Sequence, residues 1–304
     1  MKITASHSTH RIPLFILLLV MLSGCASPIQ PNDPPGTEVM PTLTPAAAAP
    51  VTATATATSS TPPPCTETQG QFVKATLPAD MLKYPLEVTV YLPPCYAANN
   101  SKTYPALYML HGMTDTNEQW IKLGLTDVAD RLISAQTIQH MLIIMPYEVN
   151  WQLSPNESGY GKAITDVLIP WVEKTYRVCT ERGCRAIGGL SRGGNWAVKL
   201  GFEHWQLFTA VGAHSTPLFI GGILDLTSAI RRLPSVSEAP VVYVDAGNKD
   251  ENLVQVKDFE RALTNLHIAH EYHTGSGAHD DAYWSDHVEG YLIWYASHLA
   301  SGTP

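Results

Sequence analysis

The residues with the clearest chemical potential lie in the segment 185–196. There Ser191 stands between Gly189 and Gly193 in the pattern G-x-S-x-G. A short apolar run precedes the pattern and a helix predicted at 195–202 follows it, which is the strand–turn–helix context of a nucleophile elbow. Such a turn strains the serine backbone, needs small flanking residues, and points a helix N-terminus at the seryl oxygen. The segment therefore predicts Ser191 as a nucleophile.

A seryl nucleophile needs a base, and after this kind of elbow an acid and then a histidine follow along the chain. The chain has six histidines beyond residue 250. His279 comes directly after the flexible stretch 275–278 and just before the last predicted helix, so its imidazole can approach the serine. His273, close to that stretch, remains an alternative. His279 is the predicted base.

The acid is expected after the apolar strand 241–244. Asp245 ends that strand, whereas Asp250 lies beyond Gly247 in the following loop. A loop carboxylate can turn toward a histidine, and a carboxylate at a strand end can simply satisfy backbone groups. We therefore favour Asp250, with Asp245 and Glu251 as alternatives.

Stabilising a tetrahedral oxyanion requires two preorganised N–H donors. The backbone N–H of Arg192, next to the nucleophile, supplies one. The turn after the predicted strand 107–110 places the Met113 N–H opposite. His111 precedes the serine and sits at a strand end, so we expect it to hold this loop rather than to act as the base.

A metal site is the competing interpretation of the C-terminal acidic residues. His279, Asp280, Asp281, Asp286 and His287 are possible ligands by type. Because a helix is predicted from about Ala282, Asp280 and Asp281 fit better as its cap and first turn. We expect neither a metal nor an organic cofactor.

The elements that must position these residues alternate between buried strands and helices. Strands are predicted at 86–92, 107–110, 141–145, 208–213 and 241–244, and helices at 164–176, 195–202, 253–266 and 282–299. Pro170 should kink or restart the first of these helices. Buried strands alternating with helices predict an α/β fold with a mainly parallel sheet covered on both faces.

The N-terminal region predicts export. Residues 1–25 combine basic residues with an apolar run at 14–22 and end in Leu-Ser-Gly-Cys, which resembles a bacterial lipobox. By that resemblance Cys25 is lipidated and attaches the protein to a membrane. Residues 26–64 are rich in Pro, Thr and Ala and predict a disordered tether. The folded domain is predicted at 65–304.

The net charge argues against one class of binding partner, and the cysteine content predicts disulfides. The net charge of −8 and the lack of a basic stripe argue against a nucleic acid partner. Apart from Cys25, the chain has four cysteines, and an exported protein can form disulfides. Cys179 and Cys184 flank a turn-like stretch, so we expect them to pair, which leaves Cys65 to pair with Cys95.

Four motifs together resemble one family of α/β-hydrolases. They are Tyr104–Gly112, Gly188–Gly194, Asp245–Asp250 and Gly277–Asp280. The chain is similar over about 70–300 to the esterases that include esterase D (S-formylglutathione hydrolase), feruloyl esterases, enterochelin esterases and mycobacterial mycolyltransferases. The resemblance implies an α/β-hydrolase fold, a Ser191–His279–Asp250 triad, and Met113 and Arg192 N–H groups as the oxyanion hole. Arg192 departs from the apolar residue of many members, and its guanidinium is expected near the mouth of the site, where it could influence substrate choice.

The sequence thus predicts an extracytoplasmic, membrane-anchored serine esterase. Acetyl or feruloyl esters, small or linked to polysaccharide, are the expected substrates, followed by siderophore esters. An acyltransferase with the same triad and a non-catalytic surface binding protein are the alternatives.

Lipidation of Cys25 is testable without any structure. Full-length protein expressed in a bacterium should fractionate with membranes, whereas Cys25→Ser should be released or left unprocessed, because the thiol is the acceptor of the lipid. Equal membrane association of the two forms would contradict the prediction.

Overall fold

The structure is a computed structural model that describes residues 65–98, 101–218 and 222–302. Cys25 and the predicted tether at 26–64 lie outside these residues. The described residues belong to one compact unit of the chain.

An eight-stranded sheet forms the centre of the domain, in the order β1-β2-β4-β3-β5-β6-β7-β8. β1 and β2 are antiparallel to each other, β2 is antiparallel to β4, and all other pairs are parallel. The strands are Gln71–Leu77 (β1), Leu86–Leu92 (β2), Ala106–Leu110 (β3), Leu142–Pro146 (β4), Arg185–Leu190 (β5), Ala210–His214 (β6), Val241–Gly247 (β7) and His270–Gly275 (β8).

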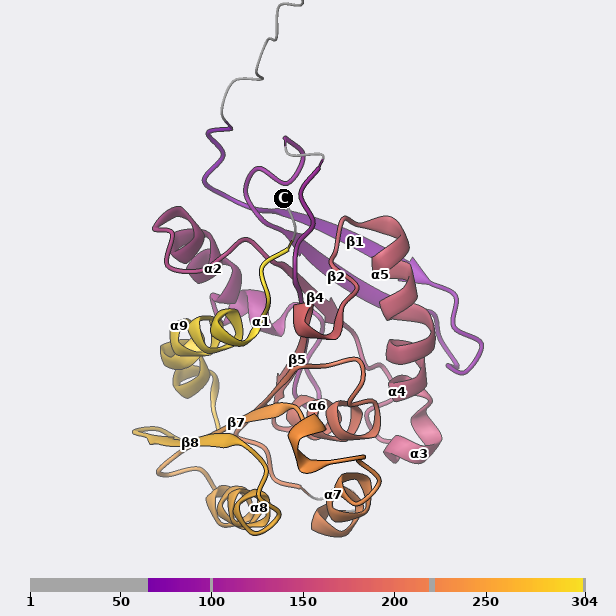
Figure 1. The fold of residues 1–304 in the computed structure, drawn as a ribbon, viewed down its shortest axis with the longest axis vertical. Coiled ribbons are helices and arrows are strands. Elements are labelled where there is room, and N and C mark those ends of the chain that lie inside the picture. The colour runs from indigo at the N-terminus through magenta and orange to yellow at the C-terminus, as the bar shows by residue number, and fades with distance from the viewer. Residues whose placement is uncertain (1–64, 99–100, 219–221, 303–304) are drawn as a thin grey trace, which may run out of the picture. The chain divides into compact units, whose positions relative to one another are not determined.

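Helices cover both faces of this sheet (Figure 1). They are α1 (Gln119–Lys122), α2 (Leu125–Ser134), α3 (Pro155–Ser158), α4 (Tyr160–Lys162), α5 (Ile169–Thr175), α6 (Arg192–Glu203), α7 (Gly222–Ile230), α8 (Leu253–Asn265) and α9 (Asp281–His298). The mainly parallel sheet with helices on either side confirms the predicted α/β fold.

The hydrophobic core is divided by the sheet into two clusters. One packs α5, α6, α7 and α8 against one face, and the other packs α1, α2 and α9 against the opposite face. Within β3 the side chains alternate between them, with Tyr108 in the first cluster and Leu107 and Met109 in the second. Because successive strand residues point to opposite faces, the fully buried runs of the central strands supply both cores.

The helical region before β5 shows the effect of Pro170. It starts as α4, widens into a π-helical turn at Ala163–Leu168, and continues as α5 with Pro170 in the first turn. Proline has no N–H to donate to the preceding turn, so the chain must rearrange just before it. Pro170 was predicted to kink or restart the helix; instead the helix continues through a π-helical turn just before the proline.

Two disulfides join the four domain cysteines in the predicted pairs. Cys65–Cys95 ties the start of the domain to the end of β2, and Cys179–Cys184 closes a loop just before β5. Bonds that close loops restrict the unfolded chain and so favour the folded one.

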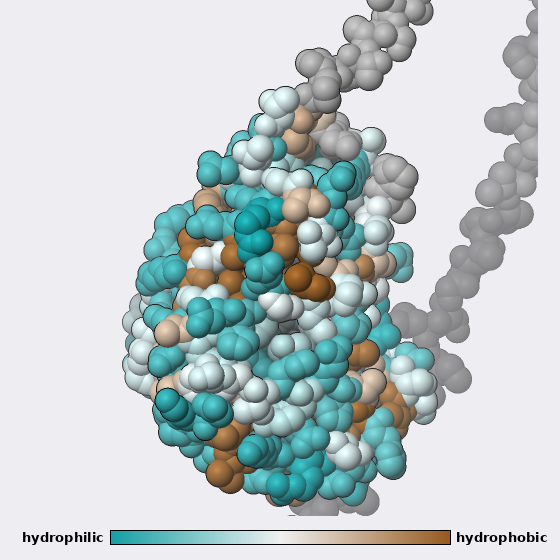
Figure 2. Space-filling view, turned by 90° about the vertical axis from the view of Figure 1, so that its left-hand side faces the viewer, coloured by the Kyte–Doolittle hydropathy of each residue, from teal (hydrophilic) through white to brown (hydrophobic). Residues whose placement is uncertain are grey.

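The side that carries α2, α9 and β8 is mostly hydrophilic, with hydrophobic side chains in separate groups (Figure 2). Among the described residues, no helix is both long and apolar enough to cross a bilayer.

Candidate active site

Ser191 lies in a sharp turn between β5 and α6. Its backbone has φ 51° and ψ −116°, a left-handed conformation that is costly for any residue with a side chain. Its N–H donates to the His214 carbonyl at 2.8 Å, and its carbonyl accepts from the Asn195 N–H at 3.1 Å. A Cβ at Gly189 would lie 2.4 Å from the Gly193 carbonyl carbon, so no larger residue fits there. The turn has the geometry predicted for a nucleophile elbow.

Two loops at the ends of neighbouring strands bring Asp250 and His279 together. The loop after β7 and the loop after β8 are joined by hydrogen bonds from Asn248 N to Gly275 O and from Lys249 N to Gly277 O, both 2.8 Å. Across this junction His279 Nδ1 lies 3.0 Å from Asp250 Oδ2.

The environment of Asp250 keeps it ionised. Burial alone would raise the pKa of its carboxyl, but hydrogen bonds from His279 and from the Asn252 N–H outweigh burial and hold that pKa below its ordinary value. A carboxylate only accepts hydrogen bonds, so His279 Nδ1 carries the proton and its Nε2 is left with a free lone pair. Trp284 packs edge-on against the imidazole, with centroids 5.1 Å apart. An imidazole held in this tautomer can serve as a general base.

Asp245 has a different set of partners. It is fully buried and accepts hydrogen bonds from His214 Nδ1 at 2.9 Å, Tyr283 Oη at 2.8 Å and Tyr291 Oη at 2.7 Å. Burial and the nearby Asp245 charge raise the pKa of the Tyr291 hydroxyl, so it remains a donor. Asp245 is thus engaged in the core between β6, β7 and α9, and none of its hydrogen bonds in the described residues is to His279.

The same core network explains two glycines in the sheet. His214 Nε2 lies 2.9 Å from the Tyr295 hydroxyl. That hydroxyl occupies the space where a Cβ at Gly188 or Gly212 would lie, at 1.7 Å in each case. β5 and β6 therefore need glycine at these positions so that the Tyr295 hydroxyl of α9 can reach His214.

The loop after β3 is held from several sides. Its Gly112 N–H donates to Gln119 Oε1 at 2.7 Å. The buried His111 has Nδ1 2.7 Å from the Gly112 carbonyl, and its Nε2 accepts the Glu148 N–H at 2.8 Å. His111 thus holds the loop that carries Met113, as expected from the sequence.

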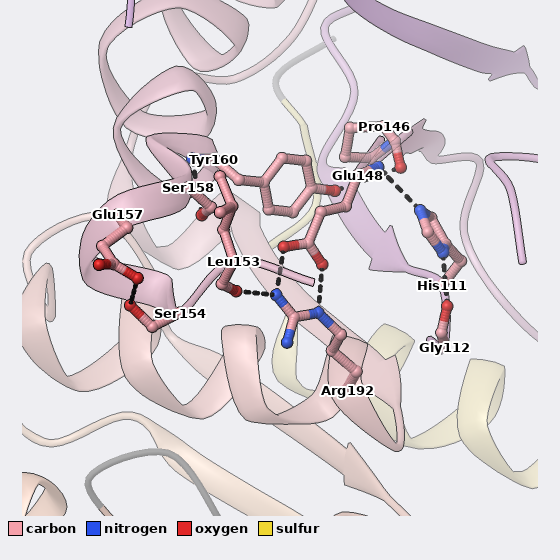
Figure 3. Close-up of polar contacts among 10 residues, drawn as sticks. All are labelled: His111, Gly112, Pro146, Glu148, Leu153, Ser154, Glu157, Ser158, Tyr160 and Arg192. Carbon is pink, nitrogen blue, oxygen red and sulfur yellow. Dashed lines mark hydrogen bonds and ion pairs between the residues drawn. The ribbon is translucent and has the colours of Figure 1, made fainter. Parts of the chain in front are cut away.

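The side chain of Arg192 is not at the mouth of a site, contrary to the expectation from sequence. It is 6% exposed and forms a two-pronged ion pair with Glu148, with Nε–Oε2 at 2.7 Å and Nη2–Oε1 at 2.6 Å. Nη2 also donates to the Leu153 carbonyl at 3.1 Å (Figure 3). Because the first helical residue points back toward the segment that contains Glu148 and Leu153, its guanidinium is buried there.

Ser191 and His279 are not joined directly. Within the described residues, no hydrogen bond links the Ser191 hydroxyl to the imidazole, and such bonds often form only when substrate is bound. A hollow of about 140 Å³, partly open to solvent, lies between α6, α7 and Pro155. Asn195 lines it, but Ser191 and His279 do not, so it adjoins the elbow without containing the reactive groups.

Three further residues of this region were not predicted from the sequence, because they belong to no recognisable motif. Glu148 lies just beyond a buried strand, Gln119 begins a short helix, and His214 ends β6. Glu148 had one indirect signal, since an arginine directly after a buried turn needs a carboxylate partner.

The His111 contacts predict a pH dependence of stability. Burial lowers the pKa of His111 below 6.5, against smaller opposing effects of the Gly112 carbonyl, Glu148 and Asp115, while Arg192 acts with burial. The unfolded chain therefore takes up a proton first as the pH falls. The contribution of neutral His111 to the free energy of unfolding is complete above pH 6.5. It is lost as the pH drops toward the lowered pKa of His111 in the folded protein.

The free energy of unfolding, measured by urea titration, should therefore fall between about pH 7 and about pH 5. His111→Gln should lose less over this range, because glutamine does not titrate. The exposed His273, changed to glutamine, serves as the control and should follow the wild type. Equal losses in His111→Gln and the wild type would contradict the assignment.

Comparison with known proteins places this geometry in context. The family model described as "Putative esterase" matches residues 79–301. An esterase of Mycobacterium tuberculosis is 25% identical over 242 residues, which cover 63% of this chain and 52% of that protein. An acetyl esterase of Caldicellulosiruptor saccharolyticus is 20% identical, over 64% of this chain and 84% of that protein. The chain thus spans about half the length of the mycobacterial relative.

Solved structures agree with these relatives. A ferulic acid esterase superposes with a TM-score of 0.69 and 28% identity, over 76% of this chain and all of that one. The S-formylglutathione hydrolase of Staphylococcus aureus superposes with a TM-score of 0.61 at 17% identity, over 75% of this chain and 99% of that one. This second similarity shows the fold only. The match of the family model over most of the described domain, on an α/β-hydrolase fold with this elbow, shows that the chain belongs to the Putative esterase family.

Proposed function

We propose that the protein is a serine esterase that hydrolyses carboxylic esters through Ser191, His279 and Asp250. The observation that carries the proposal is the Asp250–His279 hydrogen bond of 3.0 Å, formed by loops at the same edge of the sheet as the elbow that bears the strained serine. Family membership supports the same assignment of ester chemistry.

The proposed reaction has two halves. His279 Nε2 takes the proton of the Ser191 hydroxyl as its oxygen bonds to the ester carbonyl carbon, and Asp250 stabilises the imidazolium. The Met113 and Arg192 N–H groups hold the oxyanion. The alcohol leaves with the proton from His279, and water, activated by the same imidazole, then releases the acid from the acyl-enzyme.

We propose acetyl or feruloyl esters, small or linked to polysaccharide, as the substrates. The support comes from relatives named as a ferulic acid esterase, an acetyl esterase, and an endo-1,4-beta-xylanase/feruloyl esterase of Xylanibacter ruminicola that is 30% identical over 117 residues. That last match covers 34% of this chain and 16% of that protein.

We also propose that the enzyme works outside the cytoplasm, attached to a membrane through Cys25. Two disulfides in the folded domain support an oxidising compartment. Such a location disfavours a glutathione thioester as the natural substrate.

Replacing the nucleophile tests the proposed activity. Ser191→Ala should reduce kcat for p-nitrophenyl acetate by at least about 10³-fold, because the acyl-enzyme can no longer form. The melting temperature should change little, since the hydroxyl serves chemistry rather than packing. A panel of acetyl, butyryl, long-chain and feruloyl esters, with the Ser191→Ala variant as the blank, identifies the preferred acyl group. Near wild-type turnover by Ser191→Ala would contradict the proposal.

The two buried aspartates form a matched pair for testing the acid. Asp250→Asn should lose on the order of 10⁴ in kcat, as in serine proteases, because asparagine permits the wrong imidazole tautomer. Asp245→Asn should keep most of its turnover but lose about 1–3 kcal/mol of stability, since asparagine cannot accept from all three of its donors. A large kcat defect in Asp245→Asn together with an active Asp250→Asn would reverse the assignment.

A further inference from the structure

Both backbone donors of the proposed oxyanion hole are oriented through the carbonyl groups of their own peptides. A trans peptide is planar, so its N–H points opposite to its C=O, and the described residues contain no cis peptide. The Met113 N–H belongs to the peptide whose carbonyl is Gly112 O, which is bound by His111 Nδ1 at 2.7 Å. The Arg192 N–H belongs to the peptide whose carbonyl is Ser191 O, which is bound by the Asn195 N–H at 3.1 Å.

A single residue connects the two donor peptides. The Glu148 N–H donates to His111 Nε2 at 2.8 Å, which leaves the His111 proton on Nδ1 and so makes Nδ1 the donor to Gly112 O. The Glu148 carboxylate holds the Arg192 guanidinium at 2.6 and 2.7 Å. Figure 3 shows these hydrogen bonds as one connected series from Arg192 through Glu148 and His111 to Gly112.

Burial makes this connection rigid. The side chains of Arg192 and Glu148 are 6% and 4% exposed. The planar guanidinium meets the carboxylate with two parallel hydrogen bonds, which fixes direction as well as distance. The close approach of Gly193 to the end of β3 brings the two segments together, since a Cβ there would lie 2.3 Å from Leu110 O.

We propose that Glu148 is a positioning residue for the oxyanion hole, which acts through the Arg192 side chain and the His111 ring to set the spacing and direction of the Arg192 and Met113 N–H groups. The inference rests on the proposed serine esterase function. Glu148 touches neither the nucleophile nor the base, so its effect is on the transition state, where the oxyanion forms, and not on the binding of the neutral ester.

The test compares Glu148→Gln, Arg192→Met and Arg192→Lys with wild type. Each should lower kcat for p-nitrophenyl acetate by about 10- to 100-fold, because a small displacement of a donor loses part of the hole. KM should stay within about threefold, since uniform binding is unaffected. The inhibition constant of a trifluoromethyl ketone, whose adduct with serine carries the oxyanion, should rise by the same factor as kcat falls. Glu148→Gln combined with Arg192→Met should add little to either change, because the two residues act as a unit.

The ion pair of a second buried arginine, with a partly exposed glutamate, provides the control. The side chain of Arg185 is 4% exposed and pairs with Glu173. Arg185 begins β5, whereas Ser191 follows the other end of this strand. Glu173→Gln should lower the melting temperature but leave kcat and the ketone affinity unchanged, when rates are expressed per active site titrated with a fluorophosphonate. If a single variant at Glu148 or Arg192 does not fold, Arg192→Met with Glu148→Leu replaces the pair by apolar groups that are tolerated in cores, and the same loss of kcat is expected.

Wild-type kcat per titrated site and unchanged ketone affinity in the Glu148 and Arg192 variants, with only the melting temperature lowered as in Glu173→Gln, would overturn the inference and leave the esterase function standing. Hydrolysis by the wild type that survives in Ser191→Ala would instead overturn the proposed function, and this inference with it.

Discussion

The strained backbone of Ser191 is the constraint on which the site depends. A residue with φ 51° persists only where its surroundings hold it. Here the carbonyl of His214 on β6 accepts its N–H, the first turn of α6 binds its carbonyl, and glycines let the turn approach the end of β3. Sheet, helix and loop are therefore all needed to present one hydroxyl group.

Two aspartates five residues apart serve different purposes because of where their side chains lie. Asp245 lies within β7 and faces the core, where His214 and tyrosines of α9 donate hydrogen bonds to it. Asp250 follows in the loop, where it meets His279 from the next loop. The first interaction connects β6, β7 and α9 in the core, and the second orients the imidazole of His279. The two carboxylates thus have different environments, and the catalytic role is proposed for Asp250 alone.

Much of this arrangement could be predicted from the sequence, and the failures have physical reasons. The apolar run predicted as a strand at 141–145 corresponds to β4, because central strands are buried on both faces. The edge strand β8 was missed because its residues alternate poorly and are mostly polar, and α2 because neither proline nor a side-chain cap marks its start. The Ser191, Asp250 and His279 positions followed from local motifs. The Arg192–Glu148 pair did not, because its partners are 44 residues apart and only the folded chain shows that the guanidinium points inward.

Direct trapping of the acyl-enzyme tests the central claim, that Ser191 is a nucleophile activated by His279. The enzyme is mixed with p-nitrophenyl acetate, quenched with acid within the first turnover, digested and mapped by mass spectrometry. The account predicts one acetyl group, on the peptide that contains Ser191, and its absence when His279 is replaced by alanine. Acetylation of another residue, or turnover by the wild type without any acetyl group on Ser191, would contradict it.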